Sequence, residues 1–319
     1  MTHSTTRQIV PVLAALVLFA LSACGGEDAA RTDFPEIKNP PTVTPGQKVN
    51  VVATTTQIAD FVRVVGGDRV AVTELVKAGV DPHEYEPSPQ DAQRIAAANL
   101  IAVNGLGLDG YIAKLLQQAG GSKPVALLSR GVKTRTEGKG KEAETDPHIW
   151  FSPLNAKQMV DNLATALGQV DPSGNEAYKT NAVRYKGELD ALDTRIQAQI
   201  TTIPMERRKV VTNHDGLGYY IQRYGLTFVG AVIPSLETNA APSAQQIAEI
   251  VRKIRQEKVP AIFTESSLNP KLEEQIAAEA GVKVVASLFV DSLGPAGSPA
   301  ATYLQMMEYN TKAIVDGLK

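Results

Sequence analysis

A long segment in the middle of the chain constrains the fold most strongly. From residue 174 to residue 203 the apolar side chains recur at steps of three or four, and Pro204 ends the run. Steps of this size place the side chains on one stripe of an α-helix. Thirty residues that rise about 1.5 Å each make a helix of about 45 Å. We therefore predict one rigid helix that is long enough to join two lobes. Its stripe consists of Tyr178, Ala182, Tyr185, Leu189, Leu192, Ile196, Ile200 and Ile203.

The segments on both sides of this helix alternate between β-branched runs and helical spacing. Alternation of this kind is typical of a parallel sheet covered by helices. A chain of 319 residues also exceeds the usual size of one compact core. We predict an α/β fold of two parallel-sheet lobes joined by the long helix, with a binding cleft between them. The expected domains are an N-terminal lobe at 49–172, the linking helix at 173–204 and a C-terminal lobe at 205–319.

The N-terminus has the form of a secretion signal. Arg7 precedes an apolar run of about thirteen residues, which is shorter than the roughly twenty that a membrane-spanning helix needs. The run leads to Leu21-Ser22-Ala23-Cys24, which resembles a bacterial lipoprotein signal in which the cysteine receives the lipid. We predict a signal peptide at 1–23, lipidation of Cys24 and a flexible Pro- and Gly-containing tether at 24–48. The alternative for Cys24 is a buried free cysteine.

Composition excludes several classes of protein. Lys and Arg number 32 against 34 Asp and Glu, which argues against a nucleic-acid-binding protein because such proteins carry a basic excess. The single cysteine leaves no intramolecular disulfide and no cysteine-based zinc finger. The segment 133–146 is polar and charged without an apolar face, so we expect an exposed and mobile loop there.

The histidines lie where a binding site is expected. The predicted mature chain keeps three: His83 follows the second predicted strand, His148 precedes a predicted helix and His214 follows the strand at 209–212. Parallel sheets bind ligands at the carboxyl ends of their strands, so these side chains can converge on one crevice. Asp291 follows the last strand and completes a possible metal-binding set. The alternative is that each histidine is a surface or turn residue and that Asp291 caps a helix.

Five ordered motifs resemble a known family, the zinc/manganese class of solute-binding lipoproteins that serve bacterial ABC importers. They are DPHEYEPSP at 81–89, DPHIWFSP at 146–153, TNHDGLGYYIQRYGL at 212–226, FTESSLNPK at 263–271 and VDSLG at 290–294. The resemblance covers 49–319. It implies that His83, His148, His214 and Asp291 bind one metal ion between two α/β lobes. It also implies a membrane permease as the partner, and we expect a lipid-anchored, extracytoplasmic monomer.

The donor set bears on the metal. Three imidazoles and one carboxylate favour Zn²⁺, and manganese-type members tend to carry Glu at the position of His214. Mn²⁺ stays open, because the loop at 133–146 lacks the histidines that many zinc-type members carry there. The acidic residue Glu265 ends a predicted strand; it is either an acceptor for a ligand histidine or a surface residue.

Two other classes of protein fit the sequence less well. A zinc hydrolase would keep an open position for water, whereas four protein ligands fill a tetrahedral shell. A surface adhesin would be consistent with some lipoproteins of this family, but the sequence has no repeats to support it. We therefore expect a metal receptor that is not an enzyme.

Overall fold

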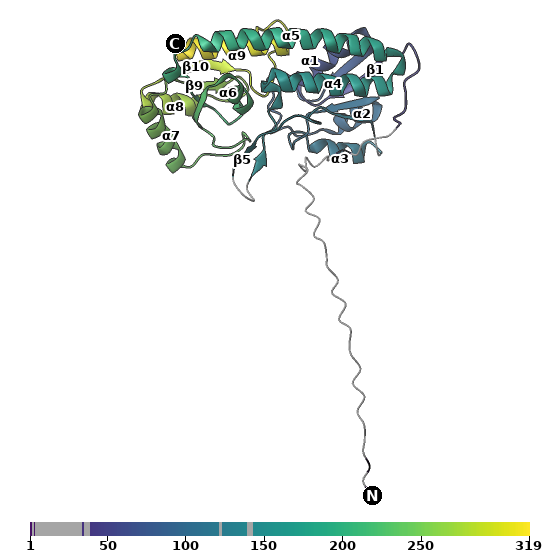
Figure 1. Cartoon of the computed structure of the whole chain (residues 1–319), viewed down its shortest axis with the longest axis horizontal. Helices are drawn as coiled ribbons and strands as arrows, with labels where there is room; N and C mark the ends of the chain where they lie inside the picture. The colour runs from purple at the N-terminus through teal and green to yellow at the C-terminus, as the bar shows by residue number, and fades with distance from the viewer. Residues whose placement is uncertain (2, 4–33, 35–38, 121–122, 139–142) are drawn as a thin grey trace. The chain divides into compact units, whose positions relative to one another are not determined.

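Two four-stranded parallel sheets form the framework of the chain (Figure 1). The computed structural model describes residues 1, 3, 34, 39–120, 123–138 and 143–319. The predicted signal peptide and Cys24 therefore lie outside the described residues, apart from positions 1 and 3. Residues Thr32–Lys319 form one unit, and both sheets belong to it.

The N-terminal sheet has helices on both faces. Its strand order is β2-β1-β3-β4, with every neighbouring pair parallel. Successive side chains of a strand point to opposite faces, so Val51 packs in the cluster that contains α1 and α4, and Val52 packs in the cluster that contains α2 and α3. The strands are β1 (Val49–Ala53), β2 (Val70–Glu74), β3 (Leu100–Val103) and β4 (Val125–Leu127), and the helices are α1 (Thr56–Gly66), α2 (Pro89–Ala97), α3 (Tyr111–Gln118) and α4 (Pro153–Val170).

The C-terminal sheet repeats this layering with the strand order β10-β9-β7-β8. Val210 packs in the cluster with α6 and α9, and its neighbour Val211 packs in the cluster with α7 and α8. The strands are β7 (Lys209–Thr212), β8 (Thr227–Ala231), β9 (Ala261–Glu265) and β10 (Lys283–Leu288), and the helices are α6 (Gly218–Tyr224), α7 (Ala244–Glu257), α8 (Lys271–Ala280) and α9 (Tyr303–Leu318). The predicted fold class, two parallel-sheet α/β lobes, is confirmed.

The long helix α5 (Asn175–Thr201) runs along both lobes (Figure 1). Every residue of its predicted stripe is buried. The stripe contacts α4 and α1 of the N-terminal lobe and α9 of the C-terminal lobe. Burial of one face along the whole helix explains why a mostly polar segment stays helical over this length.

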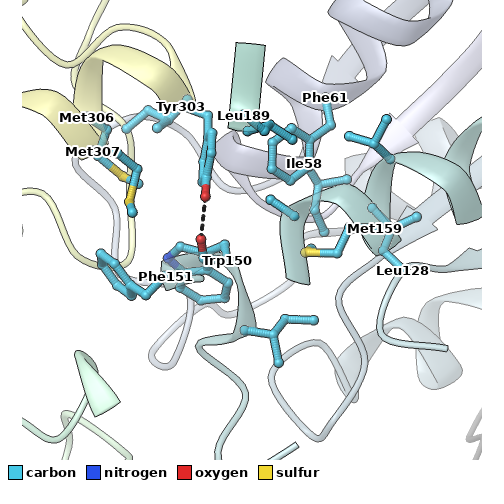
Figure 2. Packing of buried hydrophobic residues seen from close by; sticks show 14 of the residues in the cluster. Ile58, Phe61, Leu128, Trp150, Phe151, Met159, Leu189, Tyr303, Met306 and Met307 are labelled. Carbon is cyan, nitrogen blue, oxygen red and sulfur yellow. Dashed lines mark hydrogen bonds between the residues drawn. The ribbon is translucent and has the colours of Figure 1, made fainter. Parts of the chain in front are cut away.

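The two lobes share part of one hydrophobic core (Figure 2). Phe61 of α1 contacts Tyr303 of α9, with ring centroids 4.9 Å apart. The Tyr303 hydroxyl donates to the main-chain oxygen of Trp150 at 2.6 Å. The indole nitrogen of Trp150 in turn donates to the main-chain oxygen of Val290 at 3.2 Å. These buried contacts join the lobes, so the lobes are held together by a common core as well as by α5.

The expectation of an exposed loop at 133–146 is wrong for part of that segment. Residues Thr136–Glu137 (β5) pair with Glu144–Thr145 (β6) as an antiparallel hairpin. Asp146 is fully buried. Other residues of the segment are exposed, so its polar composition reflects both contact with water and a charged cluster described below.

The last part of the predicted tether also lies against the N-terminal lobe. The main-chain nitrogen of Val43 donates to the oxygen of Val170 at 2.8 Å, and Phe34 is buried beside β1 and α2. Four 3₁₀ turns complete the described chain: η1 (Gly67–Arg69), η3 (Ile149–Phe151), η4 (Pro172–Gly174) and η5 (Met205–Arg207). None of the helices in the described ranges combines the length and the hydropathy that crossing a membrane requires.

Candidate metal centre

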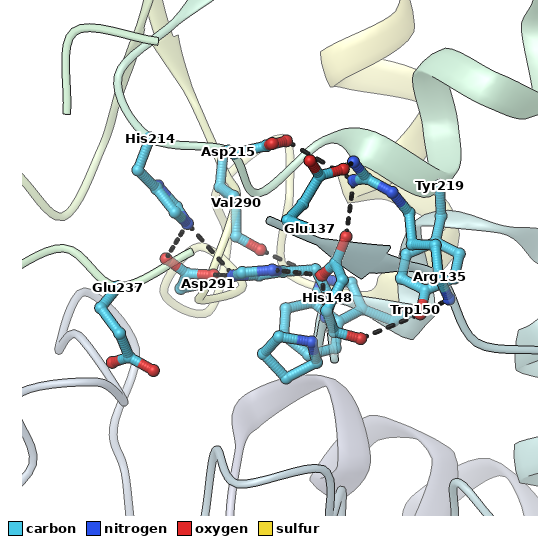
Figure 3. A network of polar contacts seen from close by, with 12 residues as sticks. Arg135, Glu137, His148, Trp150, His214, Asp215, Tyr219, Glu237, Val290 and Asp291 are labelled. Atoms are coloured by element: carbon cyan, nitrogen blue, oxygen red, sulfur yellow. Dashed lines mark hydrogen bonds and ion pairs between the residues drawn. The ribbon is translucent and has the colours of Figure 1, made fainter. Parts of the chain in front are cut away.

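The four predicted ligand residues meet in one cluster. One side-chain atom from each of His83, His148, His214 and Asp291 lies within 4.8 Å of the others. His83 lies in the loop after β2, His148 immediately precedes η3, His214 follows β7 and Asp291 follows β10. Figure 3 shows His148, His214 and Asp291 pointing toward one another. Two of the four predicted ligand residues thus come from each half of the chain.

The spacing of these atoms is that of a coordination shell. The Nε2 atom of His148 lies 3.2 Å from Nε2 of His83 and 3.1 Å from Nε2 of His214. Oxygens of Asp291 lie 3.3 Å from His148 Nε2, 3.5 Å from His214 Nε2 and 3.8 Å from His83 Nε2. Four ligands at about 2.0–2.1 Å from a tetrahedral ion are separated by about 3.3–3.4 Å. The observed distances lie close to that value.

Each imidazole is oriented by a carboxylate at its other ring nitrogen. The Nδ1 atom of His148 lies 2.7 Å from Asp146 Oδ1, and Nδ1 of His214 lies 2.6 Å from Glu265 Oε1. Nδ1 of His83 lies 2.9 Å from Glu237 Oε2. A carboxylate at Nδ1 accepts the proton of that nitrogen and turns Nε2 toward the centre of the cluster. Three Nε2 atoms therefore converge on one point, where a cation or protons can satisfy them.

Asp291 supports the same conclusion. Its side chain is fully buried, and neither carboxylate oxygen has a hydrogen-bond partner in the described part of the chain. A buried carboxylate without hydrogen bonds or a cation is strongly unfavourable. Free oxygens that face three imidazole nitrogens fit a divalent cation.

The charges of the site act on the pKa values of its members. Burial opposes the charged imidazole, but the Asp146 carboxylate and Asp291 outweigh it and raise the pKa of His148 to about 10. Glu265 and Asp291 likewise outweigh burial and raise the pKa of His214. Burial works against ionisation of Asp291, yet His214, His148 and His83 together lower its pKa. The site is therefore built to hold positive charge beside an ionised Asp291.

The two Asp-Pro-His sequences serve as turns and as ligand supports at once. Asp81 Oδ1 accepts a hydrogen bond from the main-chain N–H of His83 at 2.8 Å, and Asp146 Oδ1 accepts one from the main-chain N–H of His148 at 2.9 Å. These are the turn contacts expected of aspartate. The Thr238 hydroxyl donates to the other oxygen of Asp81 at 2.6 Å, so the His83 loop is tied to the C-terminal lobe.

Sequence reasoning missed two of the three supporting carboxylates. Glu265 was considered, and it is buried against His214. Asp146 had a local signal, because it stands two residues before a histidine as Asp81 does. Glu237 had no such signal, since it lies in the loop between β8 and α7 and approaches His83 only in the folded chain.

Comparisons with known sequences identify the family of this chain. A sequence profile of the family described as zinc-uptake complex component A, periplasmic, matches residues 51–317. The manganese ABC transporter substrate-binding lipoprotein PsaA of Streptococcus mitis is 34% identical over 280 residues, covering 86% of this chain and 90% of that protein. The metal ABC transporter substrate-binding lipoprotein ScbA of Streptococcus cristatus is 31% identical over 314 residues, covering 96% of this chain and 97% of that protein.

Solved structures show the same fold. The periplasmic zinc-binding protein TroA of Treponema pallidum has a TM-score of 0.79 and 32% identity, covering 85% of this chain and 99% of that one. A manganese-bound periplasmic metal-binding protein of Candidatus Liberibacter asiaticus has a TM-score of 0.77 and 28% identity, covering 85% of this chain and 100% of that one. The family resemblance predicted from the motifs is confirmed. The chain therefore belongs to the family of periplasmic zinc-uptake complex component A proteins.

Proposed function

We propose that this protein captures a divalent metal ion outside the cytoplasm and delivers it to the membrane permease of an ABC importer. The observation that carries the proposal is the convergence of three imidazole nitrogens and a buried carboxylate without a hydrogen-bond partner in the described part of the chain. His83, His148, His214 and Asp291 are the proposed ligands, and Glu265, Asp146 and Glu237 orient the three rings. The ion is the cargo of the protein.

Zn²⁺ is the proposed cargo. Three imidazole nitrogens and one carboxylate are a common zinc donor set, and the spacing of the donor atoms fits tetrahedral bonds to zinc. Mn²⁺ is the second candidate, because both oxygens of Asp291 are free and can add a fifth ligand atom. The streptococcal PsaA relatives, which are named manganese transporters, favour the same alternative.

The partners and the location follow from the same proposal. Substrate-binding components of ABC importers work with a membrane permease, and the relatives are named lipoproteins. We propose that the signal at 1–23 is removed, that a lipid on Cys24 holds a monomer at the membrane, and that 24–48 forms its link to the folded part. The proposed lobe boundaries remain 49–172 and 205–319, with the connecting helix at 173–204.

A receptor explains the site better than an enzyme does. Four protein ligand groups fill a tetrahedral shell, and a catalytic zinc ion normally keeps one position for water. A metal-dependent hydrolase activity of the purified protein would contradict this assignment. Binding of the protein to host matrix, retained when the ligands are mutated, would indicate a separate adhesin role.

The deciding experiment is a competitive titration of the metal-free protein with Zn²⁺ and Mn²⁺ against a chromophoric chelator at neutral pH. Elemental analysis gives the number of ions bound per chain. One Zn²⁺ held at least a hundredfold more tightly than Mn²⁺ supports a zinc receptor. Comparable affinities, or Mn²⁺ retained from growth, assign manganese or both metals. No stoichiometric binding of either ion refutes the proposal. The variant His214→Ala should lose most of the Zn²⁺ affinity while its circular dichroism spectrum stays unchanged.

A further inference from the structure

Arg135 lies at the edge of the metal centre, in a segment that sequence reasoning assigned to an exposed loop. The pairing of Thr136 with Thr145 places Arg135 opposite Asp146, and the main-chain nitrogen of Asp146 donates to the oxygen of Arg135 at 3.0 Å. The Arg135 side chain is 19% exposed. The hairpin therefore delivers a largely buried guanidinium to the carboxylate that orients His148.

The guanidinium contacts carboxylates from both lobes (Figure 3). Nη1 donates to Asp146 Oδ2 at 2.7 Å and lies 3.5 Å from Asp215 Oδ1, while Nη2 pairs with Glu137. The two carboxylate oxygens of Asp146 have different partners: Oδ1 faces the His148 ring and Oδ2 faces Arg135. Asp215 directly follows His214 in the chain. One guanidinium thus contacts a carboxylate near each of two proposed ligands, one in each lobe.

The C-terminal lobe provides a fitted space for this side chain. A Cβ atom at Gly218 would lie 1.0 Å from Arg135 Nη1 and 2.0 Å from its Cζ, so any larger residue would displace the guanidinium. The hydroxyl of Tyr219 accepts a hydrogen bond from the main-chain N–H of Arg135 at 3.1 Å and donates one to the main-chain oxygen of Asp146 at 2.9 Å. The guanidinium carbon lies 6.0 Å from the centroid of the Tyr219 ring. The Arg135 guanidinium therefore occupies space that is free only because residue 218 is a glycine.

We propose that Arg135 is a positioning residue for metal capture. It holds Asp146, and through it the His148 ring, in the orientation that binds the ion, and it links this ligand to the lobe that carries His214. The inference deepens the proposed metal-binding function and rests on it. Arg135 itself does not touch the ion.

The expected size of the effect follows from the burial of Asp146. Without the guanidinium, Asp146 Oδ2 would be a fully buried oxygen with its ionic partner removed. The carboxylate would then be free to rotate, and this rotation loosens its hold on His148 Nδ1. Loss of an outer partner of a metal ligand typically lowers metal affinity by about 10- to 100-fold. The link to Asp215 would be lost at the same time.

Four variants of the full chain test the proposal. Arg135→Gln removes the cation, and Gly218→Ala displaces it while keeping its charge. The double variant tests whether the two changes act through the same contact. Arg223→Gln is the matched control, because Arg223 also pairs with a carboxylate, Asp193, at a similar exposure of 27%, but adjoins no ligand. Circular dichroism and thermal unfolding verify that each variant folds.

Two measurements decide the outcome, with Co²⁺ as a spectroscopic probe besides Zn²⁺. We expect Arg135→Gln and Gly218→Ala each to weaken Zn²⁺ at least tenfold and to alter the visible Co²⁺ spectrum, which reports ligand geometry. The double variant should be no weaker than Arg135→Gln, because both act on one contact, and Arg223→Gln should match the wild type. Affinity of Arg135→Gln within threefold of wild type, or additive losses in the double variant, overturns the inference. Failure of the wild-type protein to bind Zn²⁺ or Co²⁺ would instead refute the proposed function.

Discussion

The substitution Asp291→Asn tests the metal centre most directly. It keeps the size of the side chain, removes its charge and replaces one free oxygen by an amide nitrogen that cannot bind a cation. The Asp291 side chain is fully buried. Breaking one partner of a buried charge pair costs about 3–5 kcal/mol. At about 1.4 kcal/mol per factor of ten, the affinity for Zn²⁺ should fall by about 10²- to 10³-fold or slightly more.

Two assays check this magnitude. Chelator competition measures the affinity directly, and scanning calorimetry measures how far the ion stabilises the fold. At a free ion concentration of 1,000 times the wild-type dissociation constant, binding stabilises the native state by about 4 kcal/mol. A thousandfold weaker variant would keep only about 0.4 kcal/mol of that stabilisation. Asp190→Asn, on the exposed side of α5, is the control. An Asp291→Asn variant that binds Zn²⁺ within threefold of wild type would refute the assignment of this carboxylate as a ligand.

Three further predictions concern pH, metal choice and the long helix. The ion must displace a proton from His148. Asp146 and Asp291 raise the pKa of this residue to about 10 against the effect of burial. Below that pH, the metal affinity should therefore fall about tenfold per pH unit for each proton displaced. Titrations at pH 6, 7 and 8 measure this slope, and a flat profile contradicts it. His214→Glu replaces a nitrogen donor by oxygen and should lower the ratio of Zn²⁺ to Mn²⁺ affinity by at least tenfold; an unchanged ratio in competition titrations would separate His214 from metal choice. Leu192→Ala leaves a cavity at a fully buried position of α5 and should lower the free energy of unfolding by about 2–5 kcal/mol. Val183→Ala on the exposed face of the same helix should change that free energy by less than about 0.5 kcal/mol. Equal effects of the two variants in denaturant unfolding would contradict the predicted stripe.

The shared core between the lobes bears on how the ion leaves. Contacts such as Tyr303 to Trp150 and Trp150 to Val290 are buried and join the lobes. Large opening of the lobes would break them together, at a cost in both packing and hydrogen bonding. The carboxylate beside His83 is the more accessible one, because Glu237 is 47% exposed whereas Asp146 and Glu265 are buried.

The sequence by itself determined the periodic features of this protein. Spacing of three and four residues specified the buried face of α5, and β-branched runs separated by helical spacing specified two parallel sheets. Strand ends located three of the four proposed ligands, because topology brings the carboxyl ends of parallel strands to one edge. The motifs then supplied the family. These features are local or follow from simple topological rules, so one sequence suffices to predict them.

Only the tertiary structure decided the surroundings of the site. Glu237 lies 154 positions from His83 in the chain, yet its carboxylate orients that ring. Arg135 and Asp146 lie in a polar segment whose composition resembles that of an exposed loop, because a buried charge cluster and a solvated one use the same residues. The space that Gly218 leaves for Arg135 carries no periodic signal either. Such contacts depend on the relative placement of elements distant in sequence, and that placement is fixed by packing of the whole core.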